Sequence, residues 1–264
     1  MARDIPGPTV LAGGNSLITP ALVGPSGGFT ASIWVNPDSI NGTRLIAAMY
    51  NSSTVNYFQL GNIATGVLFA RIFSDGTDVQ IGRKTAASAI ANSVWQHVLF
   101  TWDGTTTSAG IKIYVDGTQV DNADDQAGIF TTVSADSVAC RIGNQNSGSD
   151  ISWDGKLAEF AAWSIALSAA EIGSLARGVS PQRIQPGSRA IGYFQCYETG
   201  TATEPDRSGL GNNATTADTL NVADHPPVAP MFGFDAGWRG MFTGQAVTKV
   251  SYQPWYQIAP MVAQ

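Results

Sequence analysis

Two histidines, His97 and His225, are the general bases of this chain that titrate near neutral pH without perturbation. Neither stands beside a recognisable serine or cysteine nucleophile motif. His97 falls in an alternating apolar run, which favours cross-strand packing, and His225 falls in Asp-His-Pro-Pro, which is typical of a turn. The sequence therefore predicts no nucleophilic triad and no catalytic residue.

Paired carboxylates are the other chemistry to consider, because glycosidases place two of them across a cleft, about 5–5.5 Å apart for retention or about 6.5–9.5 Å for inversion. The glutamates of the chain are Glu159, Glu171, Glu198 and Glu204. Glu171 belongs to a helix cap, and neither Glu159 nor Glu198 has an acidic partner two or four residues away. Glycoside hydrolysis is therefore the least favoured of the functions considered.

The net charge of the chain and the spacing of its cysteines exclude several classes of partner and site. A net charge of −6 disfavours nucleic acid, and the absence of a run of about 18 apolar residues disfavours a membrane. The first residues lack the apolar region of a signal peptide, so we expect synthesis in a host cytoplasm without export by that route. Cys140 and Cys196 are too widely spaced for a Cys-x-x-Cys site, and we expect two reduced cysteines, with a disulfide as the alternative.

Apolar and polar residues alternate with period two along many short segments, as in half-buried β-strands. Glycine, asparagine, aspartate and serine separate these segments, and helical patterns do not interleave them. The pattern predicts an all-β, antiparallel sandwich or barrel. The expected strands lie within 16–23, 29–36, 44–50, 57–60, 66–73, 79–83, 95–103, 111–116, 137–142, 156–163 and 190–197.

One helix interrupts the strands. Ser168-Ala-Ala-Glu171 forms a capping box, in which each side chain satisfies a free amide at the start of a helix. Ile172 and Leu175 then supply an apolar stripe, and Gly178 ends it. We expect one short surface helix over residues 169–177.

The two chain ends differ from this middle part. Residues 1–16 are predicted to form an irregular N-terminal arm, residues 17–225 the sandwich, and residues 226–264 an aromatic, proline-rich C-terminal arm. Large aromatic side chains bury much area, so the C-terminal arm should pack on its own sandwich or on a neighbouring subunit. The predicted docking residues are Phe232, Phe234, Trp238, Phe242, Trp255 and Tyr256.

Four segments, in order, resemble the laminin-G-like, concanavalin A-like jelly-roll superfamily. They are Phe29-Thr-Ala-Ser-Ile-Trp-Val-Asn-Pro37, Val94-Trp-Gln-His-Val-Leu-Phe-Thr-Trp-Asp-Gly104, Ile111-Lys-Ile-Tyr-Val-Asp-Gly117, and Trp153 to Trp163 with the helix after it. A fifth, Gly192-Tyr-Phe194 with Glu204 to Asn213, is similar to a segment that commonly opens the domain, but here it follows. The resemblance implies a jelly-roll sandwich, with first and last strands able to fill the same place in a sheet.

Relatives of this fold often bind calcium at a sandwich rim through oxygen ligands, so the resemblance makes Ca²⁺ an open cofactor option. Acid-rich loops are also common as solvated turns, and no EF-hand spacing occurs. The candidate ligands are Asp121, Asp124 and Asp125 in one loop, Asp150 and Asp154 in another, and Asp206 beside Asn212 and Asn213.

Glycan binding is the other option that the resemblance implies. Sugar sites use an exposed aromatic platform with polar groups at loop tips, and the candidates are Trp153, Tyr50 and Tyr57. Aromatic residues in strands are also common core residues, which is the alternative for all three.

Two functions follow from these observations. The first is a structural component of a virion, such as a capsid decoration, fibre or tail protein of a bacteriophage, with other subunits or further copies of itself as partners. It rests on apolar arms at both ends and on a surface-type fold without a secretion signal. The second is a free carbohydrate-binding module or adhesin whose partner is a cell-surface glycan.

Overall fold

The computed structural model describes residues 2–5, 16–22, 27–50, 56–74, 79–133, 138–144, 151–184, 190–196, 203–216 and 221–228. The chain divides into two compact units, Met1–Met231 and Phe232–Gln264. The second unit lies outside the described residues, and with it the six predicted docking residues from Phe232 to Tyr256. The description that follows concerns the first unit.

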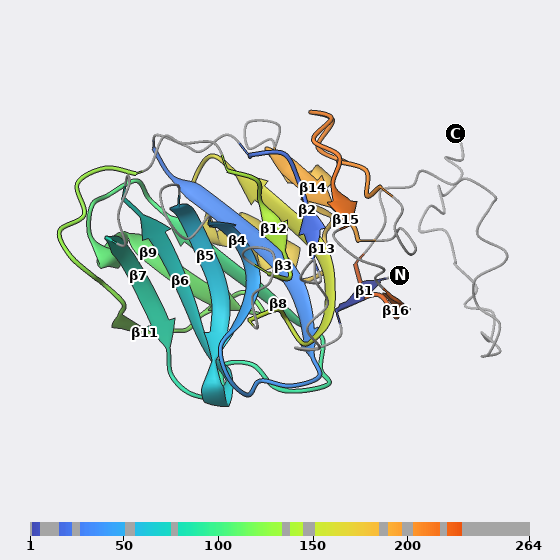
Figure 1. The fold of residues 1–264 in the computed structure, drawn as a ribbon, viewed down its shortest axis with the longest axis horizontal. Helices are drawn as coiled ribbons and strands as arrows, with labels where there is room; N and C mark the ends of the chain where they lie inside the picture. Colours follow the sequence, from blue (N-terminus) through green and yellow to red (C-terminus); the bar gives the residue numbers. More distant parts are fainter. Residues whose placement is uncertain are drawn as a thin grey trace, which may run out of the picture. The chain divides into compact units, whose positions relative to one another are not determined.

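The described residues of this unit form two antiparallel sheets of eight strands each, which confirms the predicted all-β jelly-roll sandwich (Figure 1). Sheet A has the order β10 (Thr118–Gln119), β9 (Ile111–Val115), β8 (Gln96–Trp102), β3 (Phe29–Pro37), β13 (Gly155–Trp163), β1 (Ala2–Ile5) and β16 (Asn221–Ala223), with β14 (Gly192–Phe194) also paired to β13. Sheet B has the order β11 (Asp121–Asp124), β7 (Gln80–Thr85), β6 (Val67–Phe73), β5 (Asn56–Ile63), β4 (Arg44–Tyr50), β12 (Arg141–Ile142), β2 (Leu17–Ile18) and β15 (Thr215–Thr216).

The inner faces of the two sheets meet in one apolar core. Phe29 of sheet A contacts Tyr57 and Phe58 of sheet B, with ring centroids 5.4 and 5.0 Å apart, and also contacts Phe100 of its own sheet at 5.7 Å. All four side chains are fully buried. Because side chains alternate along a strand, this inward row also fixes which residues face outward.

The outer face of sheet A is covered by the predicted helix. Helix α1 (Ala169–Ala176) begins with the capping box, since Glu171 donates its backbone N–H to Ser168 and accepts the backbone N–H of Ser168. Ile172 and Leu175 pack with Trp163 on the outer side of β13. Three short 3₁₀ turns complete the described elements: η1 (Ala64–Gly66), η2 (Ser108–Gly110) and η3 (Pro181–Arg183). Among the described residues, no helix is long and apolar enough to cross a bilayer.

The chain ends contribute strands to sheet A. Residues 2–5 form β1, which pairs with β13 on one side and with β16 on the other, so the prediction of an irregular arm over 1–16 is wrong for them. The displaced segment from Gly192 forms β14, which pairs with the second half of β13, whereas β1 pairs with the first half. Strands β1 and β14, far apart in the sequence, thus share one edge of β13.

Both cysteines are buried and no disulfide joins them, in agreement with the expectation of two reduced thiols, and burial raises the pKa of Cys140. His97 is also buried, on the outer side of β8. Its Nε2 lies 2.8 Å from the Ser32 hydroxyl, its backbone N–H donates to Asp116, and its ring lies against Trp34. The expectation that His97 packs across strands is confirmed. Burial lowers the pKa of His97 to about 3, so its ring stays neutral in the folded chain.

This burial predicts an acid-dependent loss of stability. The unfolded chain takes up a proton at His97 near pH 6.5, but the folded chain does so only near pH 3, so the free energy of unfolding falls as the pH drops between these values. At about pH 4.5 the loss from this residue should be about 2 kcal/mol relative to pH 7.

Urea unfolding of wild type and of His97→Asn at both pH values measures this effect. The difference in the free energy of unfolding between pH 7 and about pH 4.5 should be smaller in His97→Asn than in wild type. An equal pH dependence in wild type and His97→Asn would contradict the assignment.

Candidate functional site

Two of the three predicted glycan platforms are core residues. Trp153 and Tyr57 have no exposed surface, and both pack in the cluster between the sheets. The prediction that they present a face to a sugar is therefore wrong, because the strand or loop that carries each one directs it inward. Burial also raises the pKa of the Tyr57 phenol. Tyr50 is half-buried on the outer side of sheet B, where its ring lies 5.4 Å from that of Phe73.

The outer face of sheet B is the surface on which polar and aromatic side chains come together. Strand pairing aligns Gln59 of β5 with Arg71 of β6, and Arg71 with Gly82 of β7. The neighbouring row aligns Gly61, Phe69 and Lys84 in the same three strands. Both rows point away from the core, because Leu60 and Ala70 between them point into it and so does Ile81 next to Gly82.

Two glycines shape this face. A Cβ at Gly61 would lie 2.7 Å from the Phe69 ring and 2.4 Å from the Arg44 carbonyl oxygen, so the ring lies directly against the bare backbone. A Cβ at Gly82 would lie 2.8 Å from the Ala70 carbonyl oxygen and 3.1 Å from Cγ of Arg71. The absence of side chains at these two positions lets Phe69 and the stem of Arg71 lie close to the sheet.

Arg71 covers the Phe69 ring, with the guanidinium carbon 4.3 Å from the ring centroid. Its Nε donates to Asp125 at 2.7 Å, and its Nη1 donates to the Gln59 side-chain oxygen at 3.3 Å. The Lys84 ammonium lies 2.9 Å from the other Asp125 oxygen. A cation over a ring, held by a charged hydrogen bond, is fixed in orientation.

The backbone of Asp125 fixes its carboxylate in turn. Asp125 follows β11, where its N–H donates to the Gly82 carbonyl at 2.8 Å and its carbonyl accepts the Gln80 side-chain amide at 3.3 Å. Residues of β5, β6, β7 and the end of β11 therefore meet around one guanidinium. We call Gln59, Phe69, Arg71, Lys84 and Asp125 the Arg71 cluster.

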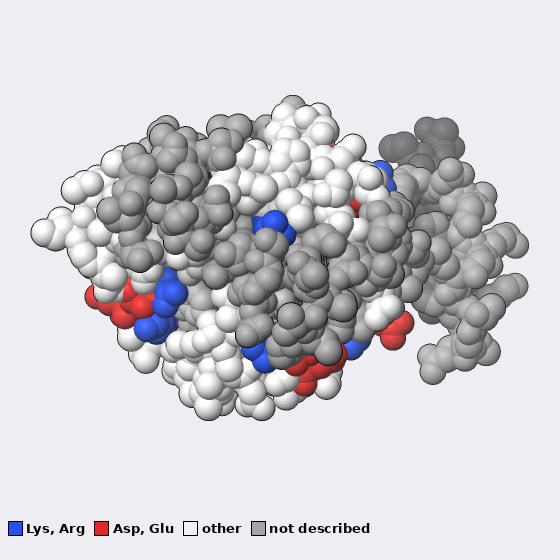
Figure 2. All heavy atoms as spheres, in the orientation of Figure 1, with Lys and Arg blue, Asp and Glu red and all other residues white. Residues whose placement is uncertain are grey.

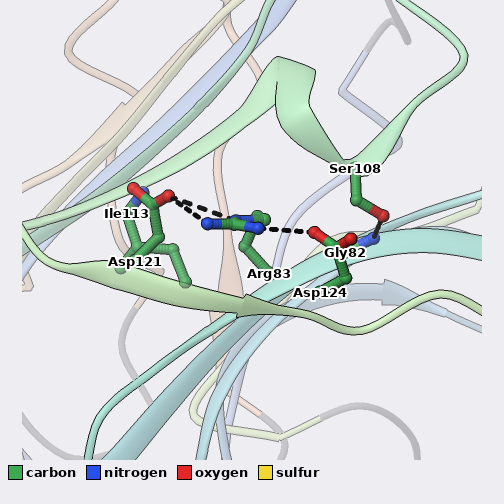
Figure 3. Close-up of polar contacts among 6 residues, drawn as sticks. All are labelled: Gly82, Arg83, Ser108, Ile113, Asp121 and Asp124. Atoms are coloured by element: carbon green, nitrogen blue, oxygen red, sulfur yellow. Dashed lines mark hydrogen bonds and ion pairs between the residues drawn. The ribbon is translucent and has the colours of Figure 1, made fainter.

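A second set of charged side chains lies next to the Arg71 cluster, on the opposite side of β7. Figure 3 shows Arg83 between Asp121 and Asp124: its Nε and Nη2 donate to Asp121 at 3.1 and 2.9 Å, and its Nη1 donates to Asp124. Asp121 also accepts the Ile113 N–H of sheet A at 3.3 Å, which ties the edges of the two sheets together. Burial alone would lower the pKa of Arg83, but its two carboxylate partners raise it. Figure 2 shows acidic and basic side chains together over β7 and β11.

The predicted calcium loop is wrong for Asp121, Asp124 and Asp125. They belong to β11 and its end rather than to a loop, strand alternation turns Asp125 to the opposite side from Asp124, and each carboxylate pairs with arginine or lysine. No group of three acidic, histidine or cysteine side chains in the described part of the chain could hold a metal ion. Asp154 is half-buried and belongs to no such group, and Asp150 lies outside the described residues.

Asp206 has a structural role instead of the predicted metal role. One of its oxygens accepts the backbone N–H groups of Tyr193 and Ser208, and the other accepts the Asn212 N–H and the Ser208 hydroxyl. Asn213 accepts the N–H of Asp206 in return. Four hydrogen-bond donors bind this carboxylate and organise the loop, and they occupy the lone pairs of both oxygens.

Sequence reasoning missed a buried polar cluster on the outer side of sheet A. Glu159, 2% exposed, lies 3.0 Å from Nε2 of His225 and accepts the Tyr193 hydroxyl, which in turn lies 3.3 Å from the Ser180 hydroxyl. Glu159 has a left-handed backbone (φ 57°) where the pairing of β13 with β3 shifts register. Burial and the neighbouring carboxylate raise the pKa of Tyr193. His225 was expected to be a turn residue, but it also contacts Glu159. No local pattern in the sequence reveals this partner, which lies 66 positions away.

Comparisons with known proteins agree on the fold. The family model of the concanavalin A-like lectin/glucanases superfamily matches residues 11–173. A Bacteroides ovatus protein described as a candidate carbohydrate-binding protein is 19% identical, with a TM-score of 0.59 over 86% of this chain and 61% of that protein. A heptameric SAP-like pentraxin from Limulus polyphemus is 20% identical, with a TM-score of 0.49 over 70% of this chain and 84% of the pentraxin. None of the curated proteins compared with the chain matches it.

The close approach at Gly61 predicts that Gly61→Ala destabilises the fold. The added methyl group must displace the Phe69 ring and the backbone of Arg44, which should lower the free energy of unfolding by about 1–3 kcal/mol. Gly27→Ala is the matched control, since a Cβ there meets nothing within 4 Å. Urea denaturation compares the two variants, and equal midpoints would show that Phe69 does not lie against Gly61.

Proposed function

The chain belongs to the concanavalin A-like lectin/glucanases superfamily, and we propose that it is a non-catalytic glycan-binding protein whose binding surface is the Arg71 cluster. The observation that carries the proposal is the fixed guanidinium of Arg71 over Phe69, with 26% of the side chain exposed. A donor held in place before binding loses little conformational entropy when a ligand arrives. Several N–H groups in one plane suit the hydroxyl groups of a sugar ring.

The neighbouring groups suit the same ligand. Gln59 and Asp125 orient the guanidinium, Lys84 contributes a further donor, and the half-buried Tyr50 adds an aromatic ring on the same face. Specific small-ligand sites combine apolar surface with a few convergent polar groups in this way. The Bacteroides ovatus protein, described as a candidate carbohydrate-binding protein, has the same fold.

The described glutamates support a function without catalysis. Glu171 caps helix α1, Glu204 is buried and accepts the Cys196 N–H at 2.9 Å, and Glu159 is enclosed by Tyr193 and His225. Each carboxylate thus has a partner that holds it within the fold. Glycoside hydrolysis needs instead two carboxyl groups that face one another across a substrate.

The role in a virion, as capsid decoration, fibre or tail protein, stays a prediction from the sequence, as do a homo-oligomeric state and location in a virus particle. Its predicted docking residues lie outside the described part of the chain. A structural role in a particle and glycan binding are compatible, because the Arg71 cluster lies on the sandwich.

Removal of the Arg71 side chain should abolish or strongly weaken glycan binding. Loss of a charged hydrogen-bond donor costs enough to weaken affinity by about tenfold or more. Lys112→Ala is the matched control, because Lys112 is an exposed cation on β9 of the other sheet.

A glycan array with wild type, Arg71→Ala and Lys112→Ala tests the proposal, after circular dichroism has shown equal folding. Binding by wild type and Lys112→Ala together with loss in Arg71→Ala supports it. Binding that Arg71→Ala leaves unchanged places the sugar elsewhere. No binding of any glycan by the wild type overturns the proposed function.

A further inference from the structure

Strand alternation sorts the charges around β7 onto two sides of sheet B. Arg71, Lys84 and Asp125 lie on the outer side, with two cations for one carboxylate. Arg83, Asp121 and Asp124 lie on the other side, with two carboxylates for one cation. Neighbours in sequence, such as Arg83 and Lys84, therefore contribute to opposite surfaces. Among these three outer groups one positive charge is in excess, although the chain as a whole carries −6.

The two outer cations are also more exposed than the carboxylate that they share. The side chains of Arg71 and Lys84 are 26% and 33% exposed, whereas that of Asp125 is 11% exposed. The carboxylate lies beneath the two cations that share it, so an approaching ligand meets the cations first. Charges held at a partly dehydrated surface act more strongly on a ligand than charges in open water.

Arg71 retains hydrogen-bonding capacity. A guanidinium has five N–H donors, and in the described part of the chain Arg71 uses Nε toward Asp125 and Nη1 toward Gln59. Its Nη2 has no acceptor among the described residues. Asp125 and Gln59 fix the guanidinium without occupying that nitrogen, and a planar carboxylate is the group that arginine binds with the best geometry.

We propose that the Arg71 cluster selects glycans that carry a sugar carboxylate, with Arg71 and Lys84 as the contacts to that carboxylate. The inference rests on the proposed function and names its ligand class. One excess positive charge suits a single carboxylate group. A polyanion such as nucleic acid would need many cations and would be repelled by the acidic remainder of the chain.

Isothermal titration with a sialylated and a uronic acid oligosaccharide tests the ligand class, since either sugar carries the carboxylate. The methyl ester of each compound is the control, because it keeps the shape and removes the charge. We expect wild type to bind at least one acid about tenfold or more tightly than its methyl ester, with an affinity that falls as salt rises. The two acids then distinguish the source of the carboxylate.

Variants on the two sides of the sheet give the second test. Lys84→Gln should weaken binding of the acid several-fold more than binding of the methyl ester, because the acid loses both a donor and an opposite charge whereas the ester loses a donor alone. Asp124→Asn, which changes charge on the opposite side, should leave the affinity for the acid within about twofold. Thermal unfolding of both variants verifies their folding.

The outcomes separate this inference from the function on which it rests. Equal binding of acid and methyl ester, abolished by Arg71→Ala, overturns the selection for carboxylates and keeps the glycan-binding function. A preference for the acid that Lys84→Gln does not change overturns the assignment of its contacts. Failure of every acidic and neutral glycan to bind overturns both proposals.

Discussion

The contact of Phe29 with Phe58 and Phe100 between the sheets is the constraint on which the rest of the structure depends. It fixes the inward row of each strand, and with period two the outward row is fixed as well. A shift of β6 by one residue would turn Ile72 outward and bury Arg71 without its partners. Burial of an unpaired charge costs far more than one lost contact, so the packing of the core also specifies the outer surface.

The sequence predicted those parts of the fold that bury apolar side chains. The alternation in β3 and β8 and the capping box of α1 all appear where local pattern placed them. Strand β11 was predicted as a loop, because Asp-Asn-Ala-Asp has no apolar alternation and pairs with β7 mainly through its backbone. An edge strand of this kind is specified by its neighbour rather than by its own residues.

The candidate site was the least predictable part for a related reason. Trp153 and Tyr57 were selected by residue type, but type alone does not show which way a side chain points, and both point into the core. Arg71 meets Asp125 only because β7 and β11 pair after a long excursion through sheet A. Contacts between distant segments depend on the assembled sheets and leave no local pattern in the sequence.

The outer sides of the two sheets differ in the segments that cover them and in the side chains that stay exposed. Helix α1 packs on the outer side of sheet A through Leu175, and Ala223 and Val228 pack there against Trp34. Between these two apolar areas Glu159 joins His225 and Tyr193, so the covering segments are held by polar contacts as well as by packing. In the described part of the chain, these segments cover the outer side of sheet A around Trp34 and β13, whereas Lys112 of β9 is exposed. On the outer side of sheet B, the side chains of Arg71 and Lys84 are 26% and 33% exposed beside the buried Phe69, and the proposed site is built on these two cations.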